Sequence, residues 1–485
     1  MKPIRILIFF LAVTGLLFLI ALVFPREGIR IGEEFTLKFR HYSDLFSRDS
    51  ISGAYTDSII KYTKVNEDPE SEITDTLLYI PDTISDAALI ARLDSLIKAR
   101  IDSIGTSVFP IEFSNEGLKD LYAFFRNAES ARERGEVVRV LHFGDSQIEN
   151  DRMTNLLRYR FQKVFGGSGC GMVPAIPLYS GNPVFQEDSG GEWIRFTGFG
   201  KKDTTLDHSC YGVLGCFTSV QSAEDELPYL DFTFREGRRA SDFSELGIYL
   251  HSYSDSGYIA LHLNDSISDT LTIVQEGYQV REFDIHFEPQ TVTMEFYLPE
   301  GGRIYGLSFD SESGVQFDNI AMRGSAGLDF SKSDRQLLDT MMQQMNPGLF
   351  LLQFGGNVVP YLNSASFYKR TFKREVKYLQ DLFPEVAIIV IGPSDMATKE
   401  NGAFLTYPML EPVRDVLREV ALETGCAFWD MYEAMGGRNS IQEFVRAEPP
   451  LASTDYIHFT QKGANMMAGM FSDALMLEYR KFTGQ

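Results

Sequence analysis

The stretch Glu136-Val-Val-Arg-Val-Leu-His-Phe-Gly-Asp-Ser146 indicates the fold of the chain. Its first eight residues are largely apolar, which is the pattern of a short strand buried on both faces. Gly144-Asp145-Ser146 then predicts a sharp turn, and residues 154–165 have the apolar spacing of a helix. Another helix is expected between Ser114, which has N-cap chemistry, and Gly135. This order of helix, strand, turn and helix is typical of a doubly wound α/β unit.

The same pattern returns after Ser331. Apolar runs predict buried strands there, and amphipathic spacing predicts the helices between them. Because the strand runs are continuous rather than alternating, we expect a sheet that is covered on both faces. The expected strands span 348–354, 386–392 and 426–430, and the expected helices span 334–344, 367–382, 413–424 and 461 to the C-terminus.

Between these two α/β parts the pattern is that of short strands. Turn residues such as Asn264-Asp265 and Glu300-Gly-Gly302 separate them. Regular short strands with such punctuation predict a β-sandwich, similar to a jelly roll. We therefore expect one α/β domain over 109–184 and 320–485, interrupted by an inserted β domain over 185–319. The expected strands of the insert span 258–263, 270–274, 280–287, 291–298 and 303–309.

The N-terminus predicts a membrane anchor. Residues 6–24 are uncharged and would form a helix of about 28 Å, close to the thickness of a bilayer core. We expect a transmembrane signal anchor within residues 1–30, with a cleaved signal peptide as the open alternative. Lys2 and Arg5 favour a cytoplasmic N-terminus, so the catalytic part would lie in the periplasm or outside the cell. Residues 31–108 look like a partly disordered spacer with one helix.

Composition excludes several classes of function. The 485 residues contain 67 acidic and 45 basic side chains, for a formal charge of −22, which is unsuited to binding nucleic acid. Four cysteines are too few for a disulfide scaffold at this length, and without a Cys-x-x-Cys pair we expect no structural metal site. Whether Cys210 and Cys216 pair stays open.

Two separate motifs could together activate a serine. Ser146 follows a buried strand and precedes a helix, where a free backbone N–H could stabilise an oxyanion. Asp455-Tyr-Ile-His458 could hold its imidazole by one nitrogen and present the other to a hydroxyl. Asn357 follows another buried strand and could donate to the same oxyanion. Taken singly, each motif is more often an ordinary turn or cap.

Taken together, the motifs resemble a family. Gly144-Asp145-Ser146, Arg323-Gly324-Ser-Ala-Gly327, Gly355-Gly356-Asn357 and Asp455-x-x-His458 occur in the order of the four blocks of the SGNH hydrolases, also called GDSL-type esterases. The resemblance covers roughly 110–184 and 320–480. It is greatest to the exported branch with an inserted β domain, which contains peptidoglycan and polysaccharide O-acetylesterases. It implies a flavodoxin-like three-layer hydrolase domain.

The resemblance also implies roles for single residues. Ser146 would be the nucleophile, His458 its base, and Asp455 the carboxylate that orients the imidazole. The oxyanion hole would consist of Ser146, Gly324 and Asn357. Asp145, Gly144 and Gly356 would support the turn. The family usually has Leu where this chain has Gln147.

These roles predict a cofactor-free serine esterase that removes O-acyl groups, in particular O-acetyl groups, from a cell-envelope or extracellular glycan. Its expected partners are the acylated glycan, the membrane through the N-terminal helix, and a membrane-bound acyltransferase. Two alternatives stay open: an O-acetyltransferase that acts on the same glycans, and a non-catalytic glycan-binding relative. A phospholipid or thioester hydrolase is a third.

Overall fold

The computed structural model describes residues 29–31, 35–37 and 108–484, except residues 180, 201–204, 223–226, 236–240, 265, 288 and 401. The expected anchor and spacer helices lie outside the described residues. In the N-terminal unit, β1 (Ile29–Ile31) and β2 (Phe35–Leu37) form an antiparallel pair. No helix in the described part of the chain is long and apolar enough to cross a membrane.

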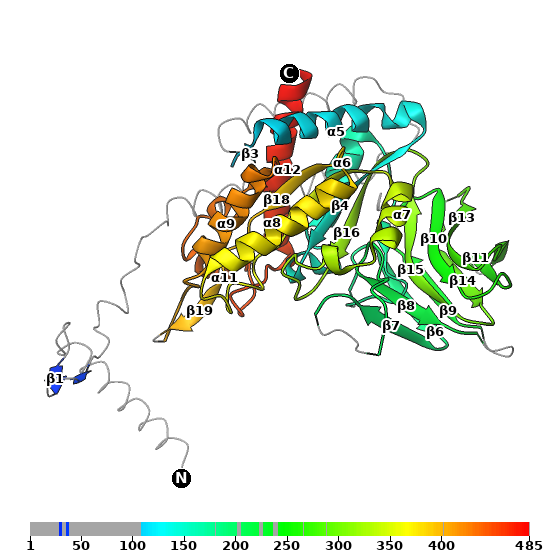
Figure 1. The fold of residues 1–485 in the computed structure, drawn as a ribbon, viewed down its shortest axis with the longest axis horizontal. Helices are drawn as coiled ribbons and strands as arrows, with labels where there is room; N and C mark the ends of the chain where they lie inside the picture. The colour runs from blue at the N-terminus through cyan, green and yellow to red at the C-terminus, as the bar shows by residue number, and fades with distance from the viewer. Residues whose placement is uncertain are drawn as a thin grey trace, which may run out of the picture. The chain divides into compact units, whose positions relative to one another are not determined.

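The main unit is built on a six-stranded sheet (Figure 1). Its strand order is β16-β4-β17-β18-β21-β3, and all strands except the edge strand β3 run parallel. When the five parallel strands are numbered by their sequence along the chain, their order across the sheet is 2-1-3-4-5, which is that of flavodoxin-like folds. The strands are β3 (Glu112–Phe113), β4 (Val137–Gly144), β16 (Gly314–Ala321), β17 (Pro347–Gln353), β18 (Ala387–Ile391) and β21 (Ala427–Trp429).

Helices cover both faces of this sheet, as the continuous apolar runs predict. Along β4, Val138 and Val140 point into one core, and Leu141 and Phe143 point into the other. The first core contains α5 (Asn115–Arg134), α6 (Thr154–Phe165) and α12 (Gln461–Thr483). The second contains α7 (Arg335–Met345), α8 (Ala365–Leu382) and α9 (Leu410–Glu423). Shorter elements are α10 (Met431–Ala434), α11 (Ser440–Arg446), η3 (Phe330–Lys332), β19 (Ala397–Glu400) and β20 (Ala403–Thr406).

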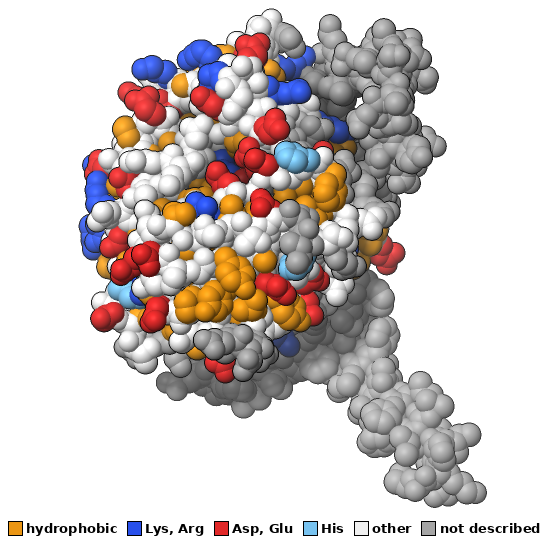
Figure 2. Space-filling view, turned by 90° about the vertical axis from the view of Figure 1, so that its right-hand side faces the viewer, with side chains coloured by type: hydrophobic (Ala, Val, Ile, Leu, Met, Phe, Trp, Pro, Cys, Tyr) orange, Lys and Arg blue, Asp and Glu red, His pale blue; other side chains and the backbone are white. Residues whose placement is uncertain are grey.

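The insert consists of two antiparallel sheets that pack face to face around a third core. One has the order β13-β10-β15-β8-β7, with β5 paired to β15, and the other β12-β11-β14-β9-β6. On the face shown in Figure 2, acidic side chains are scattered and hydrophobic ones gather in the lower part. The strands are β5 (Gly171–Val173), β6 (Phe185–Gly190), β7 (Trp193–Thr197), β8 (Cys216–Val220), β9 (Tyr229–Phe234), β10 (Glu245–Ser252), β11 (Tyr258–Leu263), β12 (Ser266–Thr272), β13 (Gly277–Asp284), β14 (Thr291–Tyr297) and β15 (Gly302–Asp310).

The insert joins the parallel sheet through a buried ionic contact. The Arg139 guanidinium on β4 lies between Asp310, the last residue of β15, and Asp318 on β16. All three side chains are buried. The chain enters the parallel sheet at β16, so the strand that leads to Gly324 begins before the boundary expected at residue 320.

Candidate active site

The candidate nucleophile lies at the carboxyl end of β4, where β16 and β17 flank it on either side. In open α/β sheets this point of reversed strand order is where ligands bind. Ser146 begins η1 (Ser146–Asp151) directly after the strand. Its Oγ atom is 2.8 Å from Nε2 of His458. The structure thus brings together two residues that the sequence separates by most of the chain.

His458 is held by the short loop that precedes α12. Its Nδ1 atom lies 2.7 Å from Oδ2 of Asp455, while Oδ1 of Asp455 accepts hydrogen bonds from the backbone N–H groups of Ile457 and His458. The loop turns tightly because Tyr456 adopts a positive φ of 59°. Partial burial alone would raise the pKa of Asp455, but these hydrogen bonds outweigh it and hold the pKa below its usual value. We therefore expect Asp455 to be ionised near neutral pH, with one carboxylate oxygen beside Nδ1 of His458.

The expected oxyanion donors surround the serine. Gly324 follows β16 with a φ of 78°, and a Cβ atom there would meet no other atom within 4 Å, so its backbone borders open space. Asn357 follows β17, and its Nδ2 atom donates to Oδ2 of Asp145 at 3.0 Å and to the carbonyl of Ser325 at 3.1 Å. Both amide hydrogens of Asn357 are thus engaged in this geometry. Asn357 can donate to an oxyanion only if it gives up one of these two hydrogen bonds.

Asp145 joins the Asn357 amide to the backbone of the serine turn. It is buried, and its Oδ1 atom accepts a hydrogen bond from the backbone N–H of Gln147. Burial raises the pKa of Asp145 to about 6. Of the two supporting glycines, Gly144 is the one that a side chain would crowd. A Cβ on Gly144 would lie 2.9 Å from the side chain of Ile148, whereas one on Gly356 would be in ordinary contact, 3.5 Å from Oδ2 of Asp145.

Gln147 is a further functional candidate, to which the sequence motifs assign no role. Its side-chain amide donates to the carbonyl of Ile457 at 2.6 Å and to Oγ of Ser394 at 3.0 Å. It thereby ties the serine turn to the histidine loop and to the segment after β18. The sequence shows that Gln147 replaces the usual Leu at this position, and this was a signal of a special role. The tertiary contacts that Gln147 makes are not visible in the sequence.

The serine and the histidine open into a cleft of about 270 Å³. Tyr361 lines this cleft with 82% of its surface exposed. The part of the chain that the structure describes contains no group of three or more His, Cys, Asp or Glu side chains arranged to hold a metal ion. Cys210 and Cys216, whose pairing the sequence left open, are free thiols. Further residues at the cleft are Gln147, Arg323, Gly324, Gly356, Asn357, Pro360, Ser394, Met396 and Ile457.

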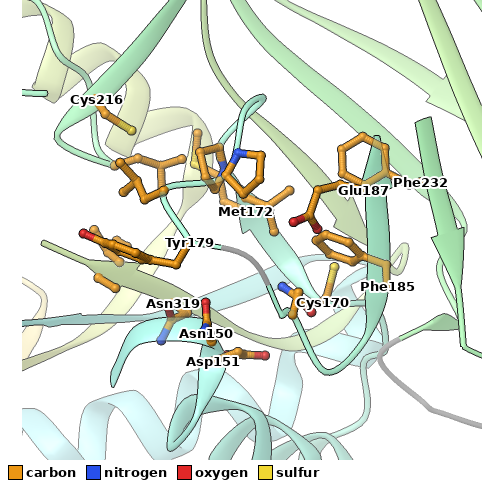
Figure 3. A pocket seen from close by; sticks show the side chains of 18 of the residues that line it. Asn150, Asp151, Cys170, Met172, Tyr179, Phe185, Glu187, Cys216, Phe232 and Asn319 are labelled. Atoms are coloured by element: carbon orange, nitrogen blue, oxygen red, sulfur yellow. The ribbon is translucent and has the colours of Figure 1, made fainter. Parts of the chain in front are cut away.

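A second, smaller pocket of about 80 Å³ lies beside the first, between the parallel sheet and the insert. Figure 3 shows Asn150 and Asn319 on one side of it and Glu187, Phe185 and Phe232 on the other. Tyr179 lies at its edge, and the guanidinium of Arg323 lies 5.0 Å above the Tyr179 ring. Because Arg323 also lines the first cleft, these two side chains form the boundary between the two pockets.

Comparisons with known proteins agree with this architecture. No protein-family model and no curated protein sequence matches the chain. The solved structure of a peptidoglycan O-acetylesterase is similar over 77% of this chain and 99% of its own, with a TM-score of 0.61 and 20% identity. At that identity the likeness establishes a shared fold with that esterase.

Two further solved structures match smaller parts of the chain. A GDSL-like lipase from Parabacteroides merdae is similar over 34% of this chain and 74% of its own, with 18% identity and a TM-score of 0.28. An acetyl xylan esterase is similar over 32% and 79%, with 14% identity and a TM-score of 0.26.

Proposed function

We propose that the protein is a serine esterase that removes O-acyl groups, in particular O-acetyl groups, from a cell-envelope or extracellular glycan. The observation that carries this proposal is the chain of two hydrogen bonds from Ser146 through His458 to Asp455 at the carboxyl end of β4. A serine hydroxyl is a weak nucleophile at neutral pH unless an adjacent base takes its proton. An imidazole fixed by a carboxylate is the usual base.

The reaction proceeds in two halves. Oγ of Ser146 bonds to the ester carbonyl carbon while its proton passes to Nε2 of His458. The tetrahedral oxyanion accepts hydrogen bonds from the N–H groups of Ser146 and Gly324, and from Asn357 once its bond to Ser325 is exchanged. Cleavage of the ester C–O bond then releases the sugar alcohol, which takes its proton from His458. Water attacks the acyl-enzyme with His458 as base, which frees the acid and restores Ser146.

A glycan substrate is supported by two observations. The similar structure with the TM-score of 0.61 is a peptidoglycan O-acetylesterase, and the two chains share their fold over nearly the whole of that protein. The exposed ring of Tyr361 beside the catalytic serine offers a flat apolar surface of the kind on which a sugar ring can stack. The uncharged run at residues 6–24 supports the further proposal of an anchored enzyme whose catalytic part is extracytoplasmic.

The test measures acetate release from a panel of O-acetylated envelope glycans, together with hydrolysis of an aryl acetate. Ser146→Ala should lower kcat on both substrates by about 10³-fold or more. Ser366→Ala removes an equivalent hydroxyl at the exposed start of α8 and should retain wild-type rates. Wild-type activity in Ser146→Ala would refute the assignment. Analysis of the products with a glycan acceptor present distinguishes release of acetate from transfer to a second sugar.

A further inference from the structure

Arg323 is the cationic side chain that borders the catalytic cleft. It directly precedes Gly324, and the cleft that it lines also contains Ser146 and His458. Its side chain is 57% exposed. The guanidinium lies against the Tyr179 ring on one side, and its Nε atom is 3.5 Å from Oε1 of Glu149. Arg323 is thus held in a defined direction while more than half of its side chain remains accessible.

A second arginine, Arg152, contacts the same Glu149 carboxylate, but its other contacts are with backbone groups inside the protein. Arg152 lies 3.7 Å from Glu149 and also donates to the backbone carbonyls of Glu149, Ser146 and Phe459. Its side chain is 18% exposed. The Glu149 carboxylate lies between the two guanidinium groups, and Arg152 is also close to the carboxylates of Asp145 and Asp455. Because Arg152 is turned inward, Arg323 is the member of this cluster whose charge is accessible from the cleft.

Two carboxylates lie close to the candidate serine. Asp145 is buried, and Asp455 is hydrogen-bonded to His458 while 44% of its side chain is exposed. The chain as a whole carries a formal charge of −22, so its overall field repels an acidic polymer. Attraction of a carboxylate into this cleft must therefore come from a cation at contact distance.

We propose that Arg323 binds a carboxylate on the glycan, so that the preferred substrate is an O-acylated polymer of acidic sugars. This inference rests on the proposed esterase function. A guanidinium group can hold a carboxylate by two parallel hydrogen bonds, and the Tyr179 ring packs against one side of the Arg323 guanidinium. Because Arg323 adjoins the oxyanion donor Gly324, the bound carboxylate lies on the sugar that carries the ester or on its neighbour.

The test compares two forms of one polymer. Polygalacturonate and its carboxyl-reduced derivative are acetylated to the same degree after the reduction, and acetate release is measured on each. For the wild type, kcat/KM on the acidic polymer should exceed kcat/KM on the carboxyl-reduced polymer by about tenfold or more. Arg323→Gln should bring this ratio close to one, and Arg323→Lys should retain part of it. Lys377→Gln, which removes one positive charge from the exposed face of α8, should keep the wild-type ratio.

The ratio is internal to each variant, so a partial loss of folded protein cancels. An equal ratio in the wild type and in Arg323→Gln would overturn the proposal. So would a wild-type enzyme that hydrolyses an aryl acetate but prefers neither polymer. Failure of the esterase function itself is distinguishable, because the wild type would then show no hydrolysis of the aryl acetate that depends on Ser146.

Discussion

The side-chain amide of Gln147 donates a hydrogen bond to the backbone carbonyl of Ile457 at 2.6 Å, so the residue after the candidate nucleophile holds the residue before the candidate base. The backbone N–H of Phe459 in turn donates to Oε1 of Gln147 at 3.4 Å. One side chain therefore contacts the backbone on both sides of His458. We therefore expect the alignment of His458 with Ser146 to depend on this contact.

Gln147→Leu, which introduces the residue that is usual in SGNH hydrolases, should lower kcat for an aryl acetate by about tenfold or more, since small displacements of catalytic groups cost rate steeply. KM should change little, because Gln147 is buried and its side-chain amide and carbonyl are both used in contacts within the protein. Gln162→Leu is a suitable control, since Gln162 is also buried and donates hydrogen bonds through its side-chain amide but lies outside the cleft. An unchanged kcat per folded Gln147→Leu enzyme would show that the contact is only structural.

Asp145 and Asn357 should act as one unit. Asp145→Asn places an amide opposite the Asn357 amide and removes the acceptor that holds it. We expect kcat to fall about 10- to 100-fold, and Asn357→Ala to lower it by about 10²- to 10³-fold. The double variant should be no slower than Asn357→Ala, because coupled residues are not additive. Additive losses in steady-state kinetics would contradict a shared role.

Tyr361→Ala tests whether the exposed ring contacts the sugar. One aromatic contact is worth about 1 kcal/mol. Its loss should raise KM for an acetylated polysaccharide about fivefold more than it raises KM for an aryl acetate. Phe367→Ala is the matched control, since Phe367 is 60% exposed but does not line the cleft. Equal effects of the two variants on polymer KM would exclude a specific stacking role for Tyr361.

Asp395 should make folding stability depend on pH. It is buried, accepts hydrogen bonds from Thr406 and Ile441, and has a pKa that burial raises to about 6. An unfolded aspartate titrates near about 4. Because the folded state binds the proton more tightly, the contribution of Asp395 to stability is fully present below about pH 4 and is lost as the pH rises through about 6.

Asp395→Asn removes this titration. Relative to the wild type, the variant should gain up to roughly 3 kcal/mol of unfolding free energy between pH 4 and pH 7, the equivalent of about two pKa units. Parallel urea unfolding at several pH values measures this difference. A difference between the two proteins that stays constant across this pH range would contradict the raised pKa of Asp395.

The sequence predicts the parallel strands that are largely apolar, and it misses the one that contains several polar residues. The segments of β4, β17, β18 and β21 are largely apolar, although β4 contains Arg139 and His142, and each was predicted as a buried strand. The strand β16 was not expected, because it contains Gln316, Asp318 and Asn319. These side chains are buried or half-buried, but they are paired with partners that only the fold supplies, such as Arg139 for Asp318.

The same distinction applies to the site. Ser146, Asp455 and His458 could be proposed from the sequence because their chemistry is encoded in short motifs, one after β4 and the other in the loop before α12. The position of Gly324 follows from β16, which pairs in parallel register with β4 so that Ala321 lies beside Gly144. The contacts of Gln147 and Arg323 could not be predicted, because each joins segments that are distant in the sequence.

The buried contact of Arg139 with Asp310 and Asp318 has a consequence for how the two domains can be separated. Excision of the insert would remove Asp310 and leave part of the Arg139 charge without its counterion in a dry environment, a defect that typically costs about 3 to 5 kcal/mol. A chimaera that exchanges this module for a foreign one must therefore import an acid at the position of Asp310. The parallel-sheet domain and its insert are therefore electrostatically matched to each other.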